Sequence, residues 1–158
     1  MTQSNRYHYT ECGLDNVYLI NGFDYVESPR GKGVVIRNRD GLDRAIGRHL
    51  IRDKKNLNGK EFRFLRHQLD MTQQLVANLL HVDVQAIARY EKGKTVPIPG
   101  PAQGMIRVLY NAKAGGHQEI TRLLEELAEL DELINGDDET LEFEETAEGW
   151  QTSDLVAA

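Results

Sequence analysis

Gln85 and Arg89 are the polar residues of this chain whose types and spacing best fit a recognition chemistry. They lie four residues apart, so a helix would place both side chains on one face. A glutamine amide can make paired hydrogen bonds with an adenine edge, and an arginine guanidinium can do so with guanine, each worth about 1–3 kcal/mol of discrimination. These groups therefore favour recognition of base edges over bond-making chemistry.

The residue types that serve catalysis or metal binding form no recognisable pattern. The five histidines are scattered, and the sequence has no Walker loop, HExxH, GxGxxG or Ser/His/Asp order. His8 and Cys12 stand four apart, but two ligands without a second pair do not make a zinc site. We expect no enzyme activity, no metal and no cofactor.

Residues 73–92 have the pattern of two short helices joined by a tight turn. Thr72 and Asp83 are helix-capping residue types, and each stands just before a helical pattern. The helices need a small residue where they cross, and Ala77 stands there. The turn position that usually holds glycine is His81, a residue type enriched in the left-handed conformation. Every inward position is apolar, and these positions are Val76, Leu80, Val82, Ile87 and Tyr90.

This segment resembles the lambda-repressor-like, Xre-type helix-turn-helix family. The matching residues are 72–77, 80–83 and 87–93. More narrowly, residues 88–93, the Pro-rich linker after them and residues 106–109 are similar to the MqsA branch of antitoxin regulators. The resemblance covers roughly residues 57–110. That branch holds zinc in its N-terminal domain on two Cys-x-x-Cys pairs, and because Cys12 is the single cysteine here, zinc binding does not carry over.

The geometry of such a unit places the second helix, residues 84–92, in the major groove of DNA. By resemblance, the positions of Gln85 and Arg89 are base readers. Helix N-termini bind anions, so the helix that begins at Gln73 would approach phosphates or a base edge. Lys60 and Arg63 would add phosphate contacts and salt dependence. The expected DNA-binding residues are Gln73, Gln74, Asp83, Val84, Gln85, Ala86, Ala88, Arg89, Lys92 and Lys94.

Around this unit the sequence predicts an α+β fold that is mainly α. Residues 1–56 are expected to form a small α+β region that binds a partner or a second copy. It would contain two or three short strands within 7–36, a hairpin-favouring Asn21-Gly22 pair, a turn at 28–33 and a short helix over 42–51.

Residues 57–113 are expected to form a five-helix, lambda-repressor-like domain that binds DNA. Asn58 can cap its first helix, whose apolar face is Phe62, Leu65 and Leu69. Pro101 is well placed as the first residue of its last helix.

The C-terminal part is expected to be a coiled-coil-like helix and an acidic tail. Residues 117–135 repeat apolar positions at heptad spacing, so their helix would either pack on the domain or join two copies. Residues 136–158 include seven acids and no base within 137–148, which predicts a disordered tail. Leu141, Phe143 and Trp150 leave a docking role open, on a partner or on the basic face in competition with DNA.

The net charge of −6 hides an asymmetry along the chain. Residues 1–118 carry 18 Lys+Arg against 11 Asp+Glu, whereas residues 119–158 carry one against 14. Within 57–113 there are eight Lys+Arg and four Asp+Glu, so that unit is at +4. The acidic total therefore does not argue against a nucleic-acid partner.

These patterns predict a cytoplasmic, homodimeric transcriptional regulator, a repressor that reads a palindromic operator in double-stranded DNA. No apolar stretch approaches the roughly 20 residues that cross a bilayer, and one cysteine fits a reducing compartment. Two other functions stay open. One is an antitoxin that neutralises a protein toxin and autoregulates its operon. The other is a helix-turn-helix used only as a platform for protein interactions.

Overall fold

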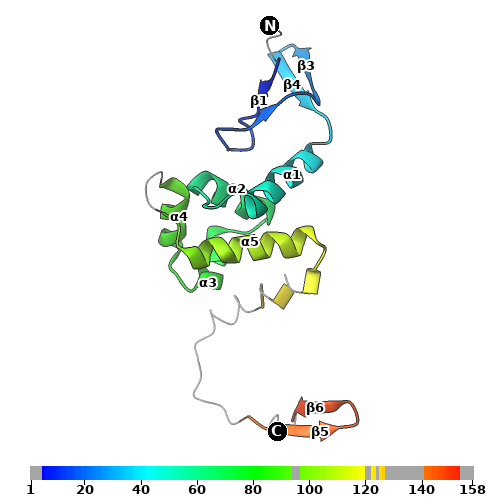
Figure 1. The fold of residues 1–158 in the computed structure, drawn as a ribbon, viewed down its shortest axis with the longest axis vertical. Coiled ribbons are helices and arrows are strands. Elements are labelled where there is room, and N and C mark those ends of the chain that lie inside the picture. The colour runs from blue at the N-terminus through cyan, green and yellow to red at the C-terminus, as the bar shows by residue number, and fades with distance from the viewer. Residues whose placement is uncertain (1–4, 94–96, 120–121, 124, 127–140, 154–158) are drawn as a thin grey trace.

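The computed structural model describes residues 5–93, 97–119, 122–123, 125–126 and 141–153. Within these residues, four short strands (β1–β4) lead into five helices (α1–α5), and a hairpin of two further strands (β5 and β6) follows (Figure 1). The fold is therefore mixed helix and strand with helix predominant, as the sequence predicts. The described part of the chain contains no helix that is long and apolar enough to cross a membrane.

Two small antiparallel ladders form the N-terminal region. Strand β1 (Tyr7–His8) pairs with β2 (Tyr18–Leu19), and β3 (Phe23–Ser28) pairs with β4 (Gly31–Ile36). The tight turn lies between Ser28 and Gly31. The Asn21-Gly22 pair joins β2 to β3, which do not pair with each other, so it closes no hairpin. The reason is that the Gly22 carbonyl accepts a hydrogen bond from the Arg37 N–H and extends the β3–β4 ladder.

Helix α1 (Arg39–Arg52) is longer than the short helix expected over 42–51. It begins earlier because Asn38, in the left-handed conformation with φ of 50°, accepts a hydrogen bond from the Gly41 N–H. Leu50 is buried, and Gly47 lies against the ring of Tyr110 in α5, where a larger residue would collide.

The remaining helices are α2 (Gly59–Gln68), α3 (Gln73–Leu80), α4 (Val84–Lys92) and α5 (Gly100–Ala114). All three predicted caps are confirmed: Asn58, Thr72 and Asp83 each accept a backbone N–H three residues on. The last helix starts one residue before the expected Pro101. Helices α2, α3 and α4 thus lie within 57–113 and α5 extends one residue beyond it, whereas α1 precedes that range, so the unit expected to hold five helices holds four.

The core lies among these helices and includes the predicted apolar face of α2. Phe62, Leu65 and Leu69 are buried there, and Tyr90 of α4 packs edge-on against Phe62 at 6.2 Å between ring centroids. The largest fully buried side chains come mostly from α2, α3, α4 and α5, together with Tyr9 of the N-terminal region, and they are Tyr9, Phe62, Leu65, Val76, Ile87, Ile106 and Leu109.

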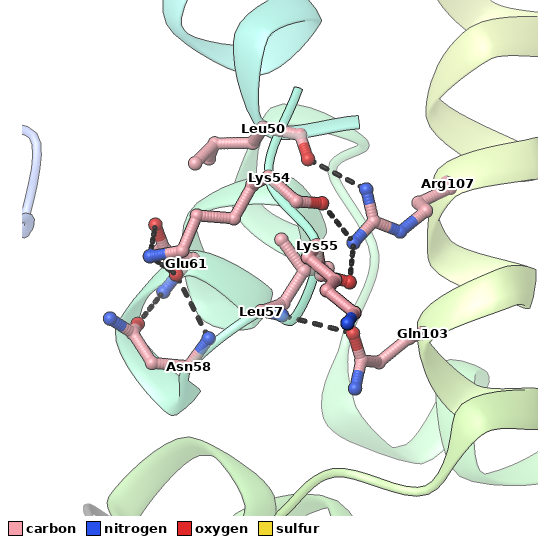
Figure 2. Close-up of polar contacts among 8 residues, drawn as sticks. All are labelled: Leu50, Lys54, Lys55, Leu57, Asn58, Glu61, Gln103 and Arg107. Carbon is pink, nitrogen blue, oxygen red and sulfur yellow. Dashed lines mark hydrogen bonds and ion pairs between the residues drawn. The ribbon is translucent and has the colours of Figure 1, made fainter. Parts of the chain in front are cut away.

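Arg107 of α5 holds the C-terminal end of α1 (Figure 2). Its guanidinium donates hydrogen bonds to the carbonyls of Leu50, Ile51, Lys54 and Lys55 at 2.7–3.3 Å. Carbonyls at a helix end lack partners within the helix, and a cation suits their negative dipole. One turn earlier on α5, Gln103 accepts the Leu57 N–H at 2.9 Å. Helix α1 is thereby fixed to α5.

The C-terminal part departs from the expected tail. Residues 143–152 form a hairpin of β5 (Phe143–Thr146) and β6 (Gly149–Thr152), where a disordered segment was expected. The turn explains this order, because the Thr146 hydroxyl bonds to the Gly149 carbonyl and the Glu148 N–H, and Gly149 supplies a φ of 105°. Of the helix expected over 117–135, residues 118–119, 122–123 and 125–126 are helical. Its apolar positions Ile120, Leu127, Leu130 and Ile134 lie outside the described residues, as do 136–140 and 154–158.

Candidate nucleic-acid interface

The turn between α3 and α4 has the geometry that the sequence predicts. His81 takes the left-handed conformation, with φ of 55° and ψ of 42°. The Val82 N–H then reaches back to the Ala77 carbonyl at 3.0 Å and closes the end of α3. Ala77 has no exposed surface, so the two helices pack as closely as a methyl group allows. The turn thereby brings α4 into contact with α3.

Helix α4 has one exposed polar stripe and one buried side. Gln85, Arg89 and Lys92 are exposed and recur at helical spacing, so they lie on the same side of the helix. Ala86 and Ile87 are buried on the other side. Ala86 was among the expected DNA-binding residues, but its side chain faces the core and cannot reach a base edge.

The other expected residues divide by exposure. Gln74 and Asp83 are exposed, whereas Gln73, Val84 and Ala88 are half-buried. The Gln74 amide bonds to Asn78 at 2.7 Å, and the Asp83 carboxylate is 2.8 Å from the Ala86 N–H that it caps. Lys94 lies outside the described residues.

A buried ion pair anchors the C-terminal end of α4. Arg66 of α2 donates hydrogen bonds of 2.7 and 2.8 Å to the two carboxylate oxygens of Glu91, and a third to the Met71 carbonyl. Gln73, which was expected to face DNA, donates to the same carboxylate at 3.2 Å. Helix α4 is thus tied to α2 and to the start of α3.

Sequence reasoning missed this pair, although a signal was present. Arg66 follows Phe62 by four residues and Glu91 follows Ile87 by four, so each charge stands on the core-facing side of its helix. Arginine and glutamate are almost never fully buried unless they are paired. Two opposite charges at such positions therefore predict a buried contact.

A cleft of about 670 Å³ adjoins the same end of α4. It brings together Lys60 and Arg63 of α2, both expected to contact phosphates, with Lys92 of α4 and Arg39 of α1. Lys60 is paired with Asp15 at 2.8 Å. At the cleft wall, partial burial and then the charges of Arg66 and Arg63 lower the pKa of His67. The same lining includes the carboxylates of Glu11, Asp43 and Glu91, so the cleft carries both signs of charge.

His8 and Cys12 have separate roles in the N-terminal region. The His8 ring contacts the Asp15 carbonyl at 2.7 Å and stacks on Tyr18. The Cys12 thiol donates to the Tyr9 carbonyl, and burial raises its pKa. In the part of the chain that the structure describes, no three His, Cys, Asp or Glu side chains are grouped so that they could hold a metal ion.

Comparison with known proteins identifies the class of this helical unit. Residues 62–108, which run from α2 to α5, match the model of the helix-turn-helix family. No curated protein and no solved structure matches the chain. The matched range contains the α3–α4 unit, the Arg66–Glu91 pair and the exposed stripe of α4. This part of the chain is therefore similar to helix-turn-helix domains, which supports a DNA-binding regulator.

Proposed function

We propose that the protein is a sequence-specific transcriptional repressor, not an enzyme, and that it acts by occupying operator DNA. The observation that carries this proposal is the exposed stripe of Gln85, Arg89 and Lys92 on α4. The helix that bears the stripe is capped by Asp83 at one end and held by the Arg66–Glu91 pair at the other. A fixed helix with an exposed polar side is what major-groove recognition requires.

In this mechanism each exposed group has a distinct task. Gln85 pairs with an adenine and Arg89 with a guanine. Lys92, with Lys60 and Arg63 in the adjoining cleft, neutralises phosphates, so affinity falls as salt rises. Neither task uses a metal or a cofactor.

The repressor is proposed to bind as a homodimer on a palindrome, because two recognition helices about 34 Å apart read two half-sites on one side of the duplex. Large apolar side chains are exposed in both regions considered for the dimer contact. Ile20, Tyr25 and Val35 are 80%, 58% and 50% exposed in the β region, and Leu123 is 55% exposed in residues 117–135.

The test is unbiased selection of bound duplexes with the full-length protein, followed by affinity measurements on the enriched site. An inverted repeat is the expected result. Gln85→Ala and Arg89→Ala should each weaken binding to that duplex by about 1–3 kcal/mol. Each should also relax the base preference at one position. Arg48→Ala, which removes an exposed arginine from α1, is the matched control and should change little. Unchanged affinity in both α4 variants would refute the recognition-helix assignment.

An antitoxin that neutralises a protein toxin and represses its own operon is the second candidate. The exposed apolar residues of the β region favour it, because they offer a surface for a protein partner. The test is co-expression with a small, basic ribonuclease-like protein encoded beside this gene. Relief of growth arrest by the wild type, and its loss in Tyr25→Ser, would support this role.

A further inference from the structure

The C-terminal hairpin has one aromatic face. Phe143 pairs with Thr152, and Glu145 pairs with Trp150. Residues that pair directly or stand two apart share a face of an antiparallel ladder. Phe143, Glu145 and Trp150 therefore lie together, with Phe143 57% and Trp150 71% exposed. Exposed aromatic groups with charged neighbours mark interaction surfaces.

The hairpin is also strongly negative. Residues 141–153 contain four glutamates and no lysine or arginine, and all four are exposed. A two-stranded hairpin is only marginally stable in water unless a further surface packs against it. An acidic hairpin with an uncovered aromatic face therefore calls for a basic surface that also offers apolar area.

The exposed side of α4 offers both properties. Arg89 and Lys92 supply positive charge, and the half-buried Val84 and Ala88 lie next to them on the helix. The sizes also agree, because four-residue strands are about 13 Å long and nine-residue α4 is about 14 Å long.

We propose that the β5–β6 hairpin docks on the exposed side of α4 in the same chain when DNA is absent. Glu145 and the neighbouring glutamates lie against Arg89 and Lys92, and the aromatic face covers Val84 and Ala88. This inference rests on the proposed function, because it makes the hairpin a competitor of DNA for the recognition helix.

The connection to the hairpin is long enough for this contact. Residues 117–142 number 26, and even at the rise of about 1.5 Å per residue found in a helix, a stretch of this length spans about 39 Å, more than the roughly 30 Å diameter of a small domain. A segment tethered to its site meets it at an effective concentration that the linker raises, so a weak contact suffices. Competition of this kind is strongest at low salt, where the charges are least screened.

Trp150 is the only tryptophan in the sequence, so the intrinsic fluorescence of the full-length protein reports on the hairpin. At low salt without DNA, we expect docking to shift the emission to shorter wavelength. About 1 M salt, where the Debye length is about 3 Å, should release the hairpin and shift the emission to longer wavelength. An Arg89→Gln/Lys92→Gln variant should give the released spectrum at low salt. Its charge-matched control, Arg48→Gln/Arg52→Gln on α1, should not.

DNA affinity separates docking from general repulsion by the acidic segment. Phe143→Ser removes an aromatic contact and keeps every charge. Docking predicts that this variant binds the selected duplex about tenfold more tightly than the wild type at low salt, a change of about 1.4 kcal/mol. The two should converge as salt rises. Gln151→Ser, on the opposite face of the hairpin, should leave affinity unchanged.

The fluorescence experiment and the DNA-affinity experiment each have an outcome that would overturn the docking contact. A Trp150 spectrum insensitive to salt and to the α4 charges, or a Phe143→Ser variant that binds DNA like the wild type, would overturn the docking contact. A spectrum that changes with protein concentration would place the hairpin on a second copy and overturn the intramolecular form. If no version binds any DNA, the proposed function fails, while the fluorescence arm still decides whether the hairpin docks.

Discussion

Arg66 and Glu91 join α2 to the end of the recognition helix through two hydrogen bonds of 2.7 and 2.8 Å. Their side chains are only 9% and 4% exposed, so the pair lies almost wholly out of water. Its position matters for the proposed recognition, because Glu91 stands two residues beyond Arg89 on the helix that carries the exposed Gln85 and Arg89. Any shift at Glu91 would tilt the side chains that are proposed to read the bases.

Removing one partner of this pair should destabilise the protein strongly. Arg66→Met leaves the Glu91 carboxylate buried without its guanidinium, and such a loss costs about 3–5 kcal/mol. Urea denaturation measures the free energy of unfolding. The double variant Arg66→Met/Glu91→Leu, which buries no charge, should recover most of that loss. A double variant as unstable as the single one would show that packing, not the unpaired charge, dominates.

Replacing each of two helical glycines by alanine should change the stability of the protein in opposite directions. A Cβ at Gly47 in α1 would overlap the Tyr110 hydroxyl in α5, and overpacking of this kind costs about 1–3 kcal/mol. Gly104 in α5 has no neighbour within 4 Å of such a Cβ, so alanine there should stabilise the protein by about 0.5–1 kcal/mol. Thermal unfolding of both variants tests the close approach of α1 to α5. Equal shifts of the melting temperature in the two variants would contradict this close approach.

The turn between α3 and α4 should tolerate glycine at position 81 but not a β-branched residue. His81→Val forces valine into the left-handed region, and we expect a loss of about 1–2 kcal/mol. His81→Gly removes the steric cost of that conformation and should leave stability near the wild-type value. Equilibrium denaturation compares the two variants. A His81→Gly variant less stable than His81→Val would show that the left-handed backbone angle does not limit which residue position 81 accepts.

His67 should make stability depend on pH. Partial burial and the charges of Arg66 and Arg63 lower its pKa in the folded state. The unfolded chain therefore binds this proton more readily, so stability falls as pH drops through the ordinary histidine pKa of about 6.5 and is retained above it. His67→Gln should flatten the pH dependence of unfolding in that window. A variant with the wild-type pH profile would rule out His67 as its source.

Local signals made much of the helical unit predictable. Asn58, Thr72 and Asp83 were identified as caps from residue type and from the helical patterns after them, because a cap bonds only three residues along the chain. Ala77 and His81 were also predictable from the sequence. Close packing of the two helices restricts position 77, and the left-handed turn restricts position 81.

Contacts between residues that are distant in the sequence were harder to predict. Arg107 meets Leu50 across 57 positions, and nothing in the sequence near either residue indicates this contact. The β5–β6 hairpin was missed because its acidic composition favours disorder, while its order depends on the turn between Thr146 and Gly149. Ala86, which the sequence predicts to contact DNA, is buried, whereas its neighbour Gln85 is exposed.

Because Arg107 binds the C-terminal end of α1, the helix-turn-helix cannot be separated from α1 without losing these contacts. A fragment that begins at residue 57 would strip four carbonyl acceptors from the Arg107 guanidinium and expose the surface of α5 that Gly47 and Leu50 cover. Leu14, far upstream, also belongs to the same core. A fusion that moves α3 and α4 into another protein would therefore have to include the N-terminal region and α1. The foreign sequence should join the chain ahead of β1.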